Sequence, residues 1–342
     1  MHVASKQPSR GTRRMRSAAL RFASVACALS LSICASAFGQ QIPAGANGTL
    51  SPDVYLKQTM PGQAPLYPTE TYTYRDTEMA LVAFTTDEEK AAALIPKELQ
   101  LVKIPQLPGQ AGAVAVFAKY RGNDQIGPYM EVIIDIPVLY KNQLYLYVPY
   151  IYVDTDAAMA AGREFGGYPK KIANIQMRHF GSLWLGTMSR GTKEAKTADP
   201  NFSDIVSVSM RKAGRLFAIP LSGDKSPELP FPYNEILPMP PPTGTPQSYA
   251  LPTMGLRRIQ GVGASAGDAV IAQLVTTPWR ISQGAFYAAS EVSLEFYPSK
   301  EDPIAQTLPV NSVLAGVILR ADVMTTAPDE WSVAADLLKP AQ

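Results

Sequence analysis

Residues 143–153 read Gln143-Leu-Tyr-Leu-Tyr-Val-Pro-Tyr-Ile-Tyr-Val153, a run in which apolar or aromatic side chains occupy both faces of the expected strand. A strand with one face in water would alternate more regularly between apolar and polar residues, so we expect this strand to be covered on both faces. The interior of a barrel on one side and a contact between subunits on the other would provide that cover.

Further strands are expected before and after this run. Lys141-Asn142 is typical of a hairpin turn and leads back to an apolar run over Tyr129–Tyr140. Similar patterns predict strands at Met79–Thr85, Leu99–Ile104, Ala113–Tyr120, Lys171–Phe180, Leu183–Arg190, Ala269–Thr276, Glu291–Tyr297 and Ser312–Val323. Helices are expected at Thr86–Leu94, Asp156–Glu164 and Pro328–Leu338. Many strands with few, short helices predict a mainly β fold (α+β) with a barrel-like sheet.

The first 39 residues have the features of a secretory signal peptide. Residues 1–22 contain six basic and no acidic residues, an apolar stretch follows, and small residues end at Ala35-Ser36-Ala37. We therefore expect cleavage after Ala37 or Gly39 and a periplasmic or secreted mature protein. Arg13-Arg14 leaves both the general secretory route and the twin-arginine route open.

Removing the predicted signal changes the composition of the chain. The full sequence has 31 basic and 29 acidic residues, whereas the predicted mature chain has 25 and 29, a net charge of −4. Such a mildly acidic chain lacks the basic surface that nucleic-acid binding requires. Both cysteines, Cys27 and Cys34, are also removed, which excludes a thiolate nucleophile, a disulfide and a thiolate zinc site.

His179 is the only histidine of the predicted mature chain, which excludes a metal site built from several histidines. It lies in an expected strand, and the sequence has no Gly-x-Ser-x-Gly nucleophile elbow, so we interpret His179 as structural. Any catalysis is therefore expected to use lysine, carboxylate and tyrosine side chains, with no metal and no other cofactor.

The rest of the chain predicts one domain. Residues 40–70 are rich in Gly, Pro, Gln and Ala and predict an extended N-terminal arm, and residues 71–342 predict a single domain. The proline-rich residues 224–247 are either a linker or an excursion over the surface. Strand patterns on both sides favour the excursion. No phosphate-binding glycine loop and no mature membrane-spanning segment is present in the sequence.

Residues 162–171 read Gly162-Arg-Glu-Phe-Gly-Gly-Tyr-Pro-Lys-Lys171 and place two lysines side by side. Two adjacent ammonium groups repel each other and apolar surroundings disfavour either charge, so both effects are expected to lower a lysine pKa and leave a free amine. Gly166-Gly167 allow a close backbone approach, and Pro169 restricts the approach to Lys170. The alternative interpretation is an ordinary solvated loop.

Glu131 is the candidate partner acid. On its predicted strand it shares a face with Tyr129, Ile133 and Asp135, while Met130, Val132, Ile134 and Ile136 lie on the other face. A carboxylate among such residues is either a charge at the rim of a pocket or an acid within it. Tyr168 is the candidate for lining the same pocket.

These residues resemble the acetoacetate decarboxylase family. The segment from Gly162 to Lys171 is similar to the family signature, and Gly127-Pro-Tyr-Met-Glu131-Val is similar to the segment that carries an active-site glutamate. The resemblance covers roughly residues 70–325. It implies that Lys170 forms a Schiff base, that Lys171 perturbs it, and that Glu131 positions groups or transfers protons. It also implies a closed, cone-like antiparallel β-barrel, large homo-oligomers and a small keto-acid substrate.

Two positions depart from the family pattern. The family has a second active-site glutamate on the preceding strand, where this sequence reads Val114-Ala-Val-Phe-Ala118. The family arginine that is implicated in binding the substrate carboxylate falls at Thr77. Arg75 and Arg121 are the nearest replacements, and we assign Arg75 to substrate binding together with Tyr168.

These residues and the resemblance leave three alternative hypotheses for the function. The first is a Schiff-base decarboxylase of a β-keto acid that releases carbon dioxide and a ketone. The second is a lysine-dependent aldolase, dehydratase or hydratase of a keto acid, which the missing glutamate and the displaced arginine favour. The third is an exported, non-catalytic barrel that binds a small ligand, for which the lysines would have ordinary pKa values.

Overall fold

The computed structural model describes residues 47–53, 64–191, 203–219, 248–263 and 266–339. The predicted signal peptide over 1–39, the proline-rich residues 224–247 and most of the predicted arm over 40–70 lie outside the described residues. All the strands described here, and the candidate site, belong to the unit that begins at Pro52.

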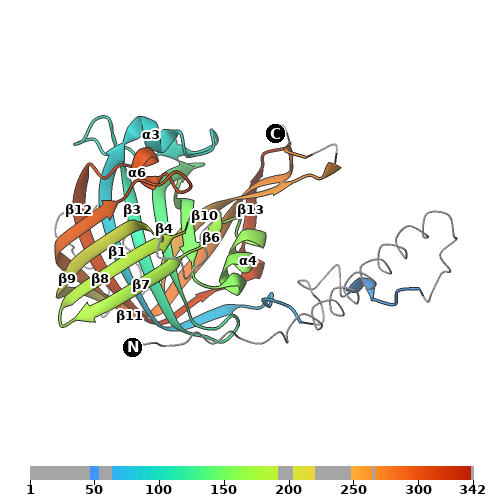
Figure 1. Cartoon of the computed structure of the whole chain (residues 1–342), viewed down its shortest axis with the longest axis horizontal. Helices are drawn as coiled ribbons and strands as arrows, with labels where there is room; N and C mark the ends of the chain where they lie inside the picture. The colour runs from blue at the N-terminus through green and yellow to red at the C-terminus, as the bar shows by residue number, and fades with distance from the viewer. Residues whose placement is uncertain (1–46, 54–63, 192–202, 220–247, 264–265, 340–342) are drawn as a thin grey trace, which may run out of the picture. The chain divides into compact units, whose positions relative to one another are not determined.

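The described chain is mainly β, as the sequence predicts, with short helices between long strands (Figure 1). In order, its elements are β1 (Tyr72–Asp87), α3 (Glu88–Ala92), β2 (Gln100–Leu101), β3 (Gln110–Asn123), β4 (Tyr129–Tyr140), β5 (Gln143–Val153), α4 (Asp156–Glu164), β6 (Lys170–Ile172), β7 (Asn174–Phe180), β8 (Leu183–Arg190), β9 (Ser203–Ile219), β10 (Tyr249–Gln260), β11 (Ala269–Phe296), α6 (Ile304–Thr307), β12 (Ser312–Thr326), the 3-10 helix η2 (Pro328–Glu330) and β13 (Ser332–Asp336).

Strand pairing closes part of the sheet into a ring. The order is β10–β5–β4–β3–β1–β12–β11, and β11 pairs again with β10. The predicted closed sheet is thereby confirmed, and its pairings are antiparallel except at the closure. There β10 and β5 are parallel and share only the pairs Thr253–Leu146 and Met254–Tyr147. The remaining part of the same β5 edge pairs with β6, over 151–153.

The long strand β11 joins the ring to a second set of strands. Its first part pairs with β10 and its last part with β9, and β9 continues to β8 and β7 (Figure 1). Register shifts interrupt the β11–β9 pairing, and Glu291 within it has a φ of 50°. Such irregularities bend a strand, which allows β11 to leave the ring and enter the second set of strands.

The two faces of β4 pack into different apolar clusters. Val132, Ile134 and Ile136 belong to the largest cluster, which also contains Trp184. Tyr129 belongs to a second cluster, and Ile133 packs against both the second cluster and a third small one formed by Val148, Ile151 and Tyr168. The predicted alternation of β4 is therefore confirmed. It places Glu131 and Asp135 on the face of the second and third clusters.

From Tyr147 to Val153, β5 is covered on both faces by residues of the same chain, whereas Leu144 near its start is 40% exposed. Tyr147 and Tyr152 lie in the largest cluster, whereas Val148 and Ile151 lie in the third. The apolar character of this strand, expected to reflect a barrel interior and a subunit contact, therefore requires no second subunit.

Two parts of the C-terminal half differ from the sequence predictions. The helix predicted over Pro328–Leu338 is wrong: after the short η2, residues Ser332–Asp336 form β13 and pair with β11. Strands β9 and β10 were not predicted. Tertiary pairing with β11 overrides the local helical pattern at the C-terminus, because β11 offers free backbone groups there.

Among the described residues, no helix has the length and apolar character needed to cross a membrane.

Candidate active site

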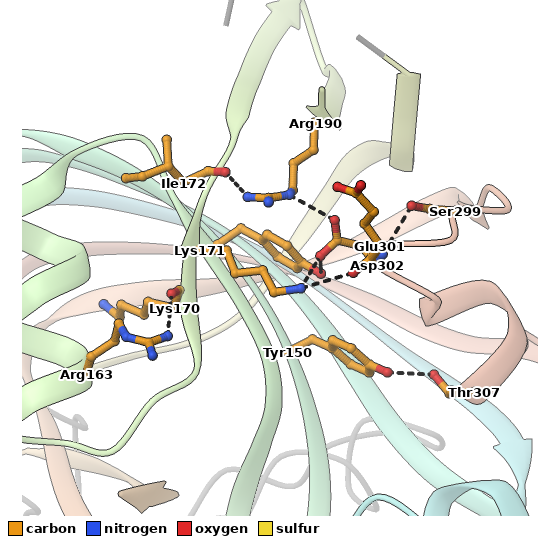
Figure 2. Close-up of polar contacts among 11 residues, drawn as sticks. Tyr150, Arg163, Lys170, Lys171, Ile172, Arg190, Ser299, Glu301, Asp302 and Thr307 are labelled. Carbon is orange, nitrogen blue, oxygen red and sulfur yellow. Dashed lines mark hydrogen bonds and ion pairs between the residues drawn. The ribbon is translucent and has the colours of Figure 1, made fainter. Parts of the chain in front are cut away.

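Lys170 is the first residue of β6 and is delivered to the sheet by α4 and a tight turn. The turn is held by backbone hydrogen bonds from Tyr168 N to Gly162 O at 3.0 Å and from Lys170 N to Tyr168 O at 2.8 Å. Arg163 Nη1 donates to the Lys170 carbonyl oxygen at 3.1 Å (Figure 2). β6 then pairs in parallel with β5, with Lys170 beside Ile151. The backbone of the lysine is thus held from both α4 and the ring.

Glycines in the motif are required by close contacts. A Cβ on Gly162 would lie 2.4 Å from Lys170 Cε, so the lysine stem packs directly on α4. Gly167 has a φ of 69°, and a Cβ there would lie 2.3 Å from the backbone nitrogen of Arg257 on β10. The close backbone approach predicted for Gly166-Gly167 is confirmed. It brings the turn against β10, beside the ring closure.

Lys170 and Glu131 form a buried pair. Lys170 Nζ lies 3.0 Å from Glu131 Oε1, and the two residues are only 6% and 2% exposed. Charged groups at this depth require a partner, because desolvation of an isolated charge is costly. The sequence predicted both residues, and the structure brings them together from β6 and β4.

Tyrosine rings surround this pair. Lys170 Nζ lies 5.7 Å from the ring centroid of Tyr129 and 5.9 Å from that of Tyr168. The rings of Tyr120 and Tyr129 pack at a tilt with centroids 4.5 Å apart, and the ring centroid of Tyr74 lies 4.8 Å from that of Tyr120. Burial, with the charge of Glu131 nearby, raises the pKa of Tyr120, and burial raises that of Tyr129. These phenols therefore remain neutral and available as hydrogen-bond donors.

Tyr168 is anchored at its hydroxyl. That group hydrogen bonds to Thr253 Oγ1 at 2.6 Å and to Thr277 Oγ1, which come from β10 and β11. Burial raises the pKa of Tyr168. Its ring thus lies beside Lys170, while its predicted role in lining a substrate pocket stays a prediction.

Lys171 has a different partner from Lys170. Its Nζ lies 2.6 Å from Asp302 Oδ1 and donates to the Glu301 carbonyl oxygen at 3.2 Å (Figure 2). Asp302 also accepts from Arg190 Nε at 2.9 Å and from the Tyr152 hydroxyl at 2.9 Å. Burial raises the pKa of Asp302, but Lys171 and Arg190 outweigh that effect and lower it overall.

The expected repulsion between the two lysines finds no support in this geometry. Adjacent residues of a strand point to opposite faces, so Lys170 reaches Glu131 while Lys171 reaches Asp302. Through its contacts with Asp302 and the Glu301 carbonyl oxygen, Lys171 connects β6 to the chain segment before α6.

Arg75 does not reach the site. Its guanidinium is exposed and pairs with Asp124. Arg121 contacts Asp76 at 3.2 Å and Glu78 Oε2 at 2.7 Å. Thr77, at the position where the family arginine was expected, is buried, and its Oγ1 has no hydrogen-bond partner among the described residues.

Several residues near Lys170 were not assigned by the sequence analysis. Tyr120 comes from β3, which pairs with β4, and Tyr74 comes from β1, which pairs with β3, so only the order of the strands brings them near Glu131. Gly162 was quoted in the motif without a role. Asp135 was placed on the face of Glu131, and the structure shows it buried. In the described parts of the chain, no group of three or more His, Cys, Asp or Glu has an arrangement that would hold a metal ion.

The sequence of this chain is similar to those of known acetoacetate decarboxylases. The family model described as acetoacetate decarboxylase matches residues 57–212. "Acetoacetate decarboxylase 3" of Mesorhizobium japonicum is 33% identical over 133 residues, which cover 39% of this chain and 49% of that protein. The chain thus spans about half the length of this curated relative.

Solved structures share the fold. Acetoacetate decarboxylase from Legionella pneumophila has a TM-score of 0.62 at 20% identity, covering 86% of this chain and 100% of the other. The enduracididine biosynthesis enzyme MppR, complexed with the condensation product of pyruvate and imidazole 4-carboxaldehyde, has a TM-score of 0.54 at 16% identity, covering 86% and 98%.

Proposed function

This chain belongs to the acetoacetate decarboxylase family, and from that premise we propose that it is a Schiff-base-forming decarboxylase of a β-keto acid. The observation that carries the proposal is the buried pair of Lys170 Nζ and Glu131 Oε1, 3.0 Å apart. A lysine amine held beside a carboxylate in a site that excludes water is the arrangement that imine chemistry requires.

The first half of the reaction forms the imine. A proton passes from the Lys170 ammonium to Glu131, and the neutral amine attacks the ketone carbon of the substrate. Glu131 then returns the proton to the hydroxyl of the carbinolamine, which leaves as water. The product is an iminium ion on Lys170 Nζ.

The second half breaks the carbon–carbon bond. The electron pair of the bond to the carboxylate moves toward the iminium nitrogen, carbon dioxide leaves, and an enamine remains. A proton is added to the enamine carbon, and water hydrolyses the resulting imine to release the ketone and regenerate Lys170. The rings of Tyr129 and Tyr168 exclude bulk water from the intermediates.

The test is borohydride trapping with acetoacetate, followed by mass spectrometry of the modified peptide. Lys170→Ala should give no adduct and no carbon dioxide, whereas Lys97→Ala, at an exposed lysine, should behave as the wild type. Glu131→Gln should lower kcat by roughly 10²–10⁴-fold, because it removes the proton-transfer group. Turnover by Lys170→Ala would refute the mechanism.

An aldol or dehydration reaction through the same imine is the second candidate. The displaced arginine favours this candidate, because the family pattern associates that residue with the carboxylate of the substrate. No arginine is among the buried charged residues of the described chain, which are Glu78, Glu131, Asp135, Lys170 and Asp302. MppR, which shares the fold, has been described in complex with a condensation product. Product analysis separates the two reactions, because only decarboxylation releases carbon dioxide. Absence of any trapped adduct would instead favour a non-catalytic, ligand-binding barrel.

Localisation and assembly are proposed on separate grounds. We place the mature protein in the periplasm or outside the cell, on the basis of the predicted signal peptide, and expect a homo-oligomer on the basis of the family resemblance.

A further inference from the structure

Asp135 is a buried carboxyl group that the proposed mechanism does not use. It is 3% exposed, and its Oδ1 has no hydrogen-bond partner among the residues that the structure describes. Buried polar atoms are nearly always paired, so an unpaired carboxyl oxygen at this depth requires an explanation. One explanation is a ligand that completes the hydrogen bond.

Asp135 faces the same side of the sheet as the catalytic pair. Glu131 and Asp135 are four residues apart on β4, which separates their Cα atoms by about 13 Å along one face. Between them lies Ile133, whose register partner Ile151 is in turn the neighbour of Lys170. A molecule bound to Lys170 between the two carboxyl groups would therefore have Glu131 at one end and Asp135 at the other.

The backbone beside Asp135 is irregular. Ile134 pairs with Tyr150 and Ile136 with Tyr147, so two residues of β5 lie opposite the single Asp135. On the other side, β3 presents Val114. A bulge of this kind redirects a side chain and is frequent beside functional sites.

The surroundings keep Asp135 protonated. Burial raises the pKa of Asp135 well above its ordinary range, and the negative charge of Glu131 raises it further. The titratable groups on this face are Glu131, Lys170 and the tyrosines Tyr120, Tyr129 and Tyr168, while the adjacent strands present Val114 and Val148. A protonated carboxyl group is a hydrogen-bond donor, and a bound carboxylate would stabilise the protonated form still more.

We propose that Asp135, as a neutral carboxylic acid, donates a hydrogen bond to the carboxylate of the keto-acid substrate and so determines specificity for acids. The inference rests on the proposed function, because the ligand is the imine of Lys170. It assigns recognition of the acid group to a residue on β4, since Arg75 lies at the surface paired with Asp124. Hydrogen bonds between a carboxylic acid and a carboxylate are short and strong.

The test compares 4-oxopentanoate with its methyl ester, which differ only in the charge of the far end. For each ligand, the half-saturating concentration for borohydride trapping on Lys170 is measured between about pH 5 and 9. The ratio of the two values cancels the protonation of Lys170, because both ligands form the same imine. The variants are Asp135→Val, which removes the donor, Asp135→Asn, which keeps a donor that does not titrate, and Thr77→Val, which removes another of the buried oxygens without a hydrogen-bond partner among the described residues.

In the wild type, the acid should bind tighter than the ester by roughly tenfold or more, and this preference should fall as pH rises and Asp135 ionises. Asp135→Val should abolish the preference while leaving ester trapping within about threefold, and Asp135→Asn should retain a preference that no longer depends on pH. Thr77→Val should leave the preference unchanged.

Three results would overturn the inference. If Asp135→Val and Asp135→Asn both keep the wild-type ratio and its pH dependence, or if Thr77→Val alone abolishes the preference, Asp135 is not the donor, although the lysine mechanism stands. If neither ligand is trapped on Lys170 of the wild type, the proposed function fails, and the inference fails with it. Because Asp135→Asn is close to isosteric with a protonated Asp, it remains informative if Asp135→Val does not fold.

Discussion

Lys170 and Lys171 are neighbours in sequence but have separate environments. Lys170 is buried against Glu131 and packs on Gly162, whereas the Lys171 side chain is partly exposed and bound to Asp302. The two amines are therefore not crowded together, and the surroundings of Lys170 are its own: Glu131, Gly162 and the rings of Tyr129 and Tyr168.

The packing of Lys170 on α4 leads to a prediction for Gly162→Ala. The added Cβ would lie 2.4 Å from Cε and 3.0 Å from Nζ of Lys170, so the end of the lysine must move. A side chain yields more easily than backbone, so stability should change by less than about 1 kcal/mol, whereas kcat/KM should fall by roughly 10²-fold from misplacement of the amine.

Gly214→Ala is the matched control, because a Cβ on Gly214 meets nothing within 4 Å. Steady-state kinetics and thermal unfolding of both variants make the comparison. Unchanged activity of Gly162→Ala would show that the position of Lys170 is not set by α4.

At the level of elements, the carboxylate of Glu78 adds a polar contact between the β7–β8 hairpin and the ring. Glu78 on β1 is buried and accepts from Trp184 Nε1 at 3.0 Å, while His179 Nε2 lies 2.6 Å from it. Arg121 and Arg320 also contact Glu78. His179, predicted to be a structural strand residue, thus lies in a contact between β7 and β1. Burial raises the pKa of Glu78, but the hydrogen bond from Arg121 and the charges of His179 and Arg320 lower it overall.

A lowered pKa makes stability depend on pH. A carboxyl group whose pKa is lower in the folded protein than in the unfolded chain contributes stability above the unfolded value, about 4.3 for Glu, and loses it as pH falls through the folded value. Glu78→Gln should therefore lower the unfolding free energy by about 1–3 kcal/mol at pH 7. That difference from the wild type should shrink as the pH falls below about 4.3.

Chemical denaturation at several pH values measures this effect, with Glu70→Gln as the control at an exposed glutamate. A wild-type advantage over Glu78→Gln that stayed constant down to about pH 3 would contradict the prediction.

On the scale of the whole molecule, the ring closes beside the candidate active site. Only two residue pairs join β10 to β5, and β6, with Lys170, occupies the next part of the same β5 edge. Close contact between Gly255 of β10 and the Gly166-Gly167 turn reinforces this closure. Stability of the ring and geometry of the site are thereby linked.

Gly255→Ala tests that link. Its Cβ would lie 2.3 Å from the Gly166 carbonyl oxygen, and backbone cannot yield as a side chain does. We expect the unfolding free energy to fall by about 1–3 kcal/mol, together with loss of imine trapping on Lys170. Retention of both properties would show that the closure is not tight in solution.

Export, which we propose from the predicted signal peptide, is tested on the whole chain. Intact-mass measurement of the protein recovered from the periplasm of a Gram-negative host should show a chain that begins after Ala37 or Gly39. Replacing Ala35 and Ala37 with bulky residues should block cleavage, because the processing site requires small side chains. A full-length mass in the wild type would exclude the predicted signal peptide.

The sequence alone was sufficient for the properties that depend on local pattern. Apolar runs predicted β4, β5 and β8 with their ends, and the motif around Lys170 pointed to the candidate nucleophile and to the close backbone approach at Gly166-Gly167. Glu131 and Tyr168 were likewise predicted near Lys170. These features depend on neighbouring residues, because strand alternation and backbone freedom are properties of short segments.

Tertiary structure decided which distant side chains meet. It paired Lys171 with Asp302 and left Arg75 at the surface with Asp124. It also made the C-terminal residues Ser332–Asp336 a strand, β13, that pairs with β11. It also buried Asp135 on the same face of β4 as Glu131. Such contacts join residues far apart in the chain, so they depend on the register and closure of the ring, which no local pattern encodes.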